Sequence, residues 1–329
     1  MDKSFDVYDV TALASILEQL GTKEKFWFKG YWDDFDEDWL FKYSRKKTGE
    51  HWSEKIAEQL CGLLEIPHAE YYLAESKGRL GVITKNLVPN GYSMIMGNQL
   101  LYAVNPQEYP QPENKCSFMH IREHTIDSIF GALTEYHVLP PGEFKYYDNQ
   151  TYESYDLKPP TPNNMISPEG MDACDVFCGY LMLDALISNQ DRHHENWAIL
   201  EDQKGKRYLC PSFDHAASLG RELLDDERTE RLKTKDRGRQ ISHFVSRATS
   251  EIFSASGTKK PLSTLDAFFE SVKDRALTKK YWLSRLETLS EKQIISLLDR
   301  IPDRLITPVA RDFAVAMIFE NKKRLLEYE

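Results

Sequence analysis

A run of polar residues between apolar segments constrains this chain more than any other feature of its sequence. The apolar stretch at residues 171–187 is typical of a buried helix, and the eight residues after Ser188, NQDRHHEN, are all polar. Two short apolar strands around the turn DQKG follow, and the second strand leads to Asp214. A loop placed between such a helix and a hairpin brings Asp191 and Asn196 to one point and returns Asp214 close to them.

These three side chains suit one class of chemistry. Phosphoryl transfer to a hydroxyl needs a carboxylate that orients the hydroxyl and accepts its proton, which Asp191 can supply. It also needs hard oxygen ligands that hold magnesium against the phosphates, and the amide of Asn196 and the carboxylate of Asp214 provide them. The pattern therefore predicts a magnesium-dependent phosphoryl-transfer site.

The same residues also have plain structural alternatives. The spacing of Asp191 and Asn196 alone fits a helix-ending loop that caps backbone groups, and an aspartate after a strand is usually a turn residue. The order of the motifs favours the chemical interpretation, because an FK pair lies upstream and SFDHA lies downstream of the polar run.

The pattern NQDRHHENW, with SFDHA after a short hairpin, resembles the HipA-like kinases, which are kinase toxins of bacterial toxin–antitoxin modules. The resemblance implies that Asp191 is the catalytic aspartate and that Asn196 and Asp214 are the magnesium ligands. Three interpretations remain open for Arg192: it orients the catalytic loop, it binds a phosphorylated residue on a mobile segment, or it is a surface arginine without a role in the site.

The N-terminal half is similar to the same family. LFKYSR matches the strand with the ATP-binding lysine, which implies Lys42. SEKIAEQLCGLLEIP resembles the helix whose acidic residue pairs with that lysine, and alignment through its IP end favours Glu54. Spacing alone does not choose, because Glu54 and Glu58 share one helical face. GVITKNL then implies a hinge that meets adenine near Thr84 to Asn86.

The elements and the resemblance together predict an α+β fold of two lobes, like that of protein kinases. Residues 1–104 are expected to form a small N-lobe with an antiparallel sheet plus one helix, and residues 105–329 a larger, mainly helical C-lobe. A helix that begins near Gly49 is expected to be capped by Thr48 and ended by Pro67. The other expected elements are a helix at 10–20, strands at 26–28, 39–43, 71–74, 80–83, 197–200 and 207–210, and helices at 121–138, 171–187, 265–272, 281–289 and 309–326.

Two features depart from the family pattern. No GxGxxG-like loop precedes Lys42, and residues 29–34 (KGYWDD) are acidic, which would repel phosphates. The chain also lacks room for the extra N-terminal domain of longer HipA proteins, so it is more similar to compact HipT-like toxins or to related secreted kinases. Because of the first departure, a pseudokinase that binds nucleotide without turnover stays an alternative. The kinase-like fold also fits an enzyme that phosphorylates a lipid or a small molecule or transfers a nucleotidyl group.

Composition narrows the remaining functions. A net charge of −10 disfavours nonspecific nucleic-acid binding, which needs a basic surface. No apolar run reaches the roughly 18 residues that a membrane span requires, and the N-terminus lacks a signal-peptide pattern, so we expect a cytoplasmic protein, with secretion into a host by a specialised system left open. The five cysteines include no CxxC pair and are expected to be reduced core thiols.

Histidines and a basic segment were the other candidates for a site. His193, His194 and His215 could suggest zinc, but adjacent histidines rarely point the same way and no cysteine lies at ligand spacing. Residues 221–239 alternate seven basic residues with acids, which is typical of a solvated segment, with a docking role as the alternative.

The resemblance also implies partners. We expect ATP and Mg²⁺ as cofactors and a serine or threonine of a bacterial protein as acceptor, with an aminoacyl-tRNA synthetase or another translation factor as a candidate. The protein itself is a further acceptor to test. A cognate antitoxin, often a DNA-binding protein, is the expected partner.

Overall fold

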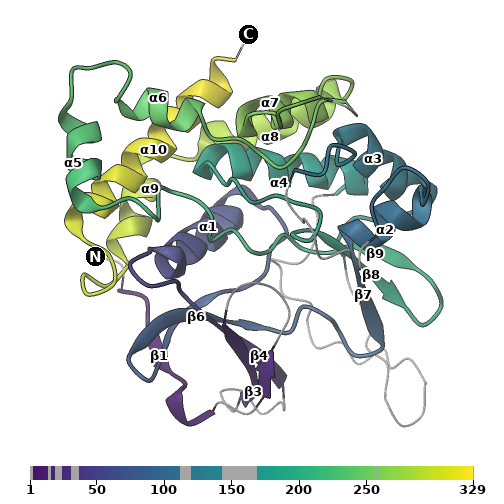
Figure 1. Cartoon of the computed structure of the whole chain (residues 1–329), viewed down its shortest axis with the longest axis horizontal. Helices are drawn as coiled ribbons and strands as arrows, with labels where there is room; N and C mark the ends of the chain where they lie inside the picture. The colour runs from purple at the N-terminus through teal and green to yellow at the C-terminus, as the bar shows by residue number, and fades with distance from the viewer. Residues whose placement is uncertain are drawn as a thin grey trace.

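The computed structural model describes residues 3–13, 16–18, 24–30, 37–111, 120–142, 169–255 and 258–328. A β-sheet lies on one side of the molecule and a larger group of helices on the other, with helix α1 (Glu50–Leu64) between them (Figure 1). The predicted α+β architecture, a small N-terminal sheet beside a larger helical part, is confirmed.

The N-terminal sheet contains six described strands in the order β1-β5-β6-β4-β3-β2. Strands β1 and β5 are parallel, and the other neighbouring pairs are antiparallel. The sheet predicted to be antiparallel therefore has one parallel edge. Its strands are β1 (Val7–Asp9), β2 (Ile16–Glu18), β3 (Lys25–Gly30), β4 (Glu37–Tyr43), β5 (Tyr72–Ser76) and β6 (Arg79–Lys85).

Aromatic side chains fill the core of this sheet. Phe26, Phe28 and Phe41 are buried, and the rings of Phe26 and Phe41 stack with their centroids 5.1 Å apart. Between β5 and β6 the chain reverses through Lys77 and Gly78, both at positive φ, as a two-residue hairpin loop requires. The aromatic strands and the hairpin predicted from the sequence are confirmed.

The helix predicted at residues 10–20 is wrong. The described residues there form a short 3₁₀ turn (Thr11–Leu13) and β2, and Val10 directly follows the end of β1. The backbone N–H of Val10 donates to the carbonyl of Glu75 at 2.9 Å, which extends the pairing of β1 with β5, and the Val10 side chain is buried. Pairing with a distant strand thus overrides the local helical pattern, since local propensity is only a weak guide.

Helix α1 is confirmed, but its predicted cap is wrong. Gly49 occupies the N-cap position and provides no side-chain cap. The hydroxyl of Thr48 instead donates to the carbonyl of Arg45 at 2.8 Å, because both belong to the turn that joins β4 to α1. The helix ends ahead of Pro67, as predicted.

A second, smaller sheet contains β7 (Tyr92–Met96), β8 (Ala198–Asp202) and β9 (Arg207–Leu209). The hairpin of β8 and β9 was predicted, whereas β7 was not. Strand β7 pairs antiparallel with β8 over its whole length, so a segment from the N-terminal third of the chain is bonded to the strand that follows the polar loop.

Helix α4 (Ala173–Ile187) is the centre of the helical part and packs against α7 and α10. Gly179 allows the close approach of Trp282, because a β-carbon at this glycine would lie 2.4 Å from the indole. The helices predicted for this part are confirmed, with shorter bounds at α3 and α4. Helix α9 lies in the region beyond Leu262 that was expected to be helical, and α5 lies in the segment expected to be a solvated helix or loop, whereas α2 and α6 were not predicted. The other helices are α2 (Gly97–Val104), α3 (Ile126–Glu135), α5 (Asp225–Lys233), α6 (Ile241–Ser246), α7 (Thr264–Ser271), α8 (Ala276–Thr288), α9 (Glu291–Asp299) and α10 (Pro308–Leu326).

The described cysteines and helices have the character that the sequence predicts. The four described cysteines are free and buried, as expected of core thiols, and Cys116 lies outside the described residues. Burial raises the pKa of Cys174 to about 11, which keeps this thiol protonated near neutral pH. Among the described helices, none has both the length and the apolarity that a membrane span requires.

Candidate active site

A buried ion pair holds the loop that follows α4. The guanidinium of Arg192 is fully buried and donates to both carboxylate oxygens of Asp184 on α4, at 2.7 and 2.9 Å. It also donates to the backbone carbonyl of Asn196 at 2.7 Å and to the hydroxyl of Ser212 at 3.2 Å. Burial acts to lower the pKa of Arg192, but the Asp184 carboxylate outweighs it and raises the pKa. Because Arg192 is buried, it is not a surface arginine, and its contacts favour the loop-orienting interpretation.

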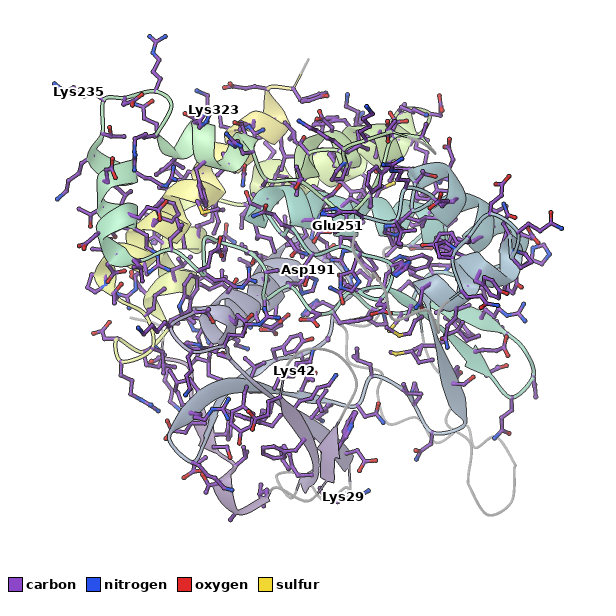
Figure 2. The ribbon with its side chains drawn as sticks, in the orientation of Figure 1. Lys29, Lys42, Asp191, Lys235, Glu251 and Lys323 are labelled. Carbon is purple, nitrogen blue, oxygen red and sulfur yellow. The ribbon has the colours of Figure 1, made fainter. Side chains whose placement is uncertain are left out.

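Asp191 lies at the surface of this loop, near the middle of the molecule (Figure 2), with 36% of its side chain exposed. Its backbone carbonyl accepts a hydrogen bond from Nδ2 of Asn196 at 2.6 Å, so the amide of Asn196 turns its oxygen the other way. Nε2 of His193 lies 3.7 Å from a carboxylate oxygen of Asp191. Burial lowers the pKa of His193, so this imidazole is neutral at pH 7.

Asp214 occupies a turn in the left-handed region, with a φ of 56°. Non-glycine residues seldom adopt this conformation, although aspartate tolerates it better than most. The Asp214 backbone N–H donates to the hydroxyl of Tyr71 at 3.2 Å, and its carboxylate lies 3.6 Å from Nζ of Lys42. The turn therefore aims this carboxylate toward the N-terminal sheet rather than into the helical part.

The structure brings Lys42 and Glu54 to the same region but not into an ion pair. Lys42 is on β4 and forms its ion pair with Asp214, whereas a Glu54 oxygen accepts the backbone N–H of His215 at 2.7 Å. Nδ1 of His215 lies 3.4 Å from that same oxygen. The carboxylate of Glu58 is bonded to other residues of α1 and faces His68, so of the two helix candidates Glu54 is the one that faces the site.

Thr84 and Asn86 lie where the chain leaves the first sheet. Thr84 is buried, and its hydroxyl donates to the carbonyl of Lys85 at 3.3 Å. The backbone N–H of Asn86 donates to Asp38, while its side-chain oxygen accepts the N–H of Val88 at 3.1 Å. The chain from Asn86 to β7 connects the two sheets, which is the position that a hinge between lobes requires.

The histidines serve the packing of the loop. Nδ1 of His194 and the hydroxyl of Tyr109 are 2.6 Å apart, and Nε2 of His215 lies 2.7 Å from the hydroxyl of Ser212. Burial lowers the pKa of His194 to about 4. The described residues contain no group of histidine, cysteine and carboxylate side chains arranged to hold a metal ion without further ligands.

Two buried histidines that lie away from the candidate magnesium ligands should make the free energy of unfolding decrease at acidic pH. Burial lowers the pKa of His51 to about 4 and that of His124 to about 3. His124 accepts from the indole N–H of Trp197 and contacts the carbonyl of Glu251, so both ring nitrogens are used in the neutral form. Since the unfolded imidazole titrates near 6.5, stability is fully present above that pH and is lost as the pH falls. The two histidines together give a slope of up to about 2.7 kcal/mol per pH unit.

Urea denaturation between about pH 7 and pH 5 measures this slope, above the range where carboxylates titrate. His124→Gln is expected to lower the slope by up to about 1.4 kcal/mol per pH unit, the share of one histidine. The matched control is His243→Gln, at an exposed position on α6, which should leave the slope unchanged. An identical slope in wild type and His124→Gln would show that another group titrates here.

Three residues that shape the site were missed in the sequence. Asp184 had a detectable signal, because it is the single charged residue in the otherwise apolar stretch GYLMLDALI. Tyr71 and Ser212 had none, since each acts through one hydroxyl on a partner far away in the sequence or across a turn. Their roles became visible only with the fold.

Comparisons with known proteins find similar folds among solved structures. No family model matches the chain, and no curated protein matches it by sequence. A Helicobacter pylori proinflammatory kinase, CtkA, is 17% identical, with a TM-score of 0.66 over 98% of this chain and 100% of that chain. HipA of Shewanella oneidensis, from a toxin–antitoxin complex with HipB and operator DNA, is 11% identical, with a TM-score of 0.50 over 95% of this chain and 65% of that chain.

At these identities the similarity is one of fold. It extends over nearly the whole chain, and it agrees with the resemblance carried by NQDRHHENW and SFDHA in the loop and turn described above. The chain therefore has the fold of the HipA-like kinases.

Proposed function

We propose that this protein is an ATP- and magnesium-dependent protein kinase that phosphorylates serine or threonine hydroxyls. The observation that carries the proposal is the convergence of Lys42 from the sheet with Asp191, Asn196 and Asp214 from the helical part. His193 lies near both acids: its Nε2 is 3.7 Å from a carboxylate oxygen of Asp191, and the charge of Asp214 acts to raise its pKa.

The side chains present fit magnesium. Asn196 directs its amide nitrogen to the carbonyl of Asp191, which leaves its oxygen for a metal ion, and Asp214 adds a carboxylate of which 26% of the side chain is exposed. Magnesium prefers such hard oxygen donors and completes its coordination with water and phosphate oxygens. Bound there, the ion would neutralise charge on the phosphates.

The residues of the chain then divide the remaining work. Lys42 would bind the α- and β-phosphates, and Glu54 would hold the Asp214 turn through the backbone of His215. Asp191 would orient the acceptor hydroxyl and accept its proton as that oxygen bonds to the γ-phosphorus and ADP departs. The backbone near Thr84 and Asn86 would meet the adenine ring. Most of the rate enhancement would come from positioning and charge stabilisation, as in other phosphoryl transfers.

One fold neighbour supports a proposal for the partner, and the family resemblance supports one for the acceptor. Because HipA of Shewanella oneidensis is found with HipB in a toxin–antitoxin complex, we propose an antitoxin protein as a partner of this chain. We further propose a bacterial cytoplasmic protein as substrate, with an aminoacyl-tRNA synthetase or another translation factor as the first to test and autophosphorylation alongside it.

A nucleotide-dependent binding module without turnover is the second candidate. One observation favours it, namely that Lys42 pairs with Asp214 while Glu54 is occupied by His215. A site in this arrangement must exchange those contacts before Lys42 can bind phosphates and Asp214 can bind magnesium.

Incubation of the purified protein with radiolabelled ATP, magnesium and a bacterial extract tests the proposal. We expect label on an extract protein or on the protein itself, and loss of that label when magnesium is chelated. Asp214→Ala is expected to abolish the transfer because a magnesium ligand is removed. ATP binding by the wild type without any transfer would favour the binding module, and release of pyrophosphate instead of ADP would indicate nucleotidyl transfer.

A further inference from the structure

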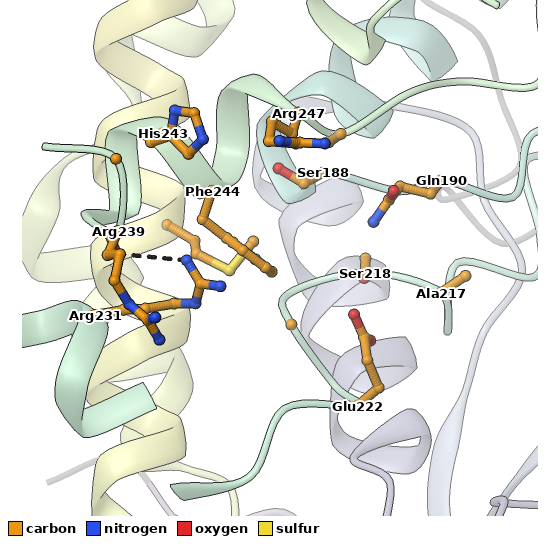
Figure 3. A pocket seen from close by; sticks show the side chains of 14 residues that line it. Ser188, Gln190, Ala217, Ser218, Glu222, Arg231, Arg239, His243, Phe244 and Arg247 are labelled. Carbon is orange, nitrogen blue, oxygen red and sulfur yellow. Dashed lines mark hydrogen bonds between the residues drawn. The ribbon is translucent and has the colours of Figure 1, made fainter. Parts of the chain in front are cut away.

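A polar pocket of about 530 Å³ lies beside the candidate catalytic loop, on the helical side of Asp191. One wall is formed by Gln190 of the loop and by Ser218 and Glu222, which follow Asp214 in the chain (Figure 3). The facing wall comes from α5, α6 and the turn between them. Its three arginines are Arg231, Arg239 and Arg247.

The pocket lies on the side from which a protein acceptor must approach. Gln190 is the chain neighbour of Asp191, and its backbone N–H donates to the carbonyl of Ala217 at 3.2 Å, so the loop and the segment after Asp214 form one continuous wall. Lys42 lies on the sheet side of Asp191, whereas Lys235, after α5, lies on the helical side (Figure 2). A nucleotide held by Lys42 would leave the pocket side open to the acceptor.

The charge of the pocket is opposite to that of the whole chain. The protein carries a net charge of −10, yet the lining has three arginines and a single acid, Glu222. Arg231 is bonded to Glu227 at 2.8 Å and Arg239 to Glu230 at 2.6 Å. Arg247 is exposed at the rim, and no carboxylate of the described residues lies within ion-pair distance of it. An incoming anion would therefore find one arginine that needs no prior partner exchange.

We propose that this pocket binds an acidic side chain of the acceptor protein, a carboxylate or a phosphate, close in sequence to the hydroxyl that is phosphorylated. The inference rests on the proposed kinase function and adds its substrate class. Because Gln190 of the pocket wall is the chain neighbour of Asp191, an extended acceptor chain would place the anion within a few residues of the acceptor hydroxyl. Phe244 and Met317 provide apolar surface in the same pocket, where a charge interaction is stronger than in open water.

Binding of short labelled peptides tests the pocket without nucleotide. Each peptide holds one serine acceptor, with the flanking positions occupied by glutamate, phosphoserine or alanine, and fluorescence anisotropy gives the Kd. We expect both acidic peptides to bind about tenfold more tightly than the alanine peptide and to weaken with salt. The tighter of the two identifies the anion as carboxylate or phosphate.

The decisive variant is Arg247→Ala, which should remove most of the preference for acid. The matched control is Arg237→Ala, an exposed arginine of the turn between α5 and α6 that does not line the pocket. Equal binding of acidic and neutral peptides up to roughly 1 mM would overturn the proposal, as would equal loss in both variants. Competition by a short oligonucleotide of equal charge as effective as the acidic peptide would overturn it too, because the pocket would then be a site for any polyanion.

Transfer of radiolabelled phosphate from ATP to the same peptides, measured in parallel, distinguishes the proposed kinase function from the proposed anion site. Preference for acid without any phosphoryl transfer would sink the kinase function while the anion site stands. Transfer that ignores the flanking acids and the state of Arg247 would sink the anion site and leave the kinase function intact.

Discussion

Phosphoryl transfer should fall at least about a hundredfold when Asp191 is replaced by asparagine, while ATP binding is retained. Asparagine has nearly the same shape but accepts a proton far less readily, so the acceptor hydroxyl would lose its base. The backbone carbonyl that accepts Nδ2 of Asn196 is unchanged by the substitution, and the loop should keep its conformation.

Label transfer and nucleotide binding are measured on the same preparations. Asp312→Asn, at an exposed position on α10, makes the same chemical change away from the site and should behave as wild type. If Asp191→Asn retains wild-type transfer, Asp191 is not the base, and the arrangement at its loop must serve another purpose.

The largest expected effect on stability is that of Asp184→Ala. The substitution leaves the guanidinium of Arg192 fully buried without its carboxylate and also removes the acceptor for Nδ2 of Asn189. Loss of one partner of a buried ion pair destabilises by about 3–5 kcal/mol, out of the roughly 5–15 kcal/mol that typical domains possess. Urea denaturation should therefore show a much lower midpoint, and part of the protein should be unfolded when expressed.

Two controls test whether the loss of stability depends on the burial of the ion pair. The double variant Asp184→Ala with Arg192→Met removes both charges and should recover part of the lost stability. Glu24→Ala breaks an exposed pair with Arg79 and should change stability by less than about 1 kcal/mol. A loss no larger for Asp184→Ala than for Glu24→Ala would mean that Arg192 finds another partner.

The sequence predicted the candidate site better than its detailed contacts. The contrast between an apolar helix and NQDRHHEN marks a polar loop at a helix end, and such local contrast survives folding. The contact of Lys42 with Asp214 depends on how β4 faces a turn 172 positions later in the chain. Spacing along the chain says nothing about that distance, so the expected partner of Lys42 was Glu54.

The errors in the fold have the same origin. The helix predicted at residues 10–20 was lost to strand pairing, because Val10 continues the ladder of β1 with β5 and β2 pairs with β3. Strand β7 was missed because its partner, β8, lies about a hundred residues further along. In both segments the backbone hydrogen bonds go to residues outside the segment, which local propensity does not register. The pocket beside Asp191 was equally hidden, although the basic residues at 221–239 were noticed.

The pairing of β7 with β8 also limits how the molecule can open and close. Ladder bonds from Tyr92 to Met96 fasten the segment after the first sheet to the strand that begins two residues after Asn196, so both must travel together. The pivot is thereby shortened to residues 86–91, where Pro89 and the bond of Val88 to Asn86 restrict the backbone further. Helix α1 packs against β5 and β6 on one side and α4 on the other, so it forms a second connection between the N-terminal sheet and the helical part. Admission of nucleotide and departure of ADP would thus proceed by small rotations about a stiff, doubly anchored joint rather than by a wide swing of one lobe.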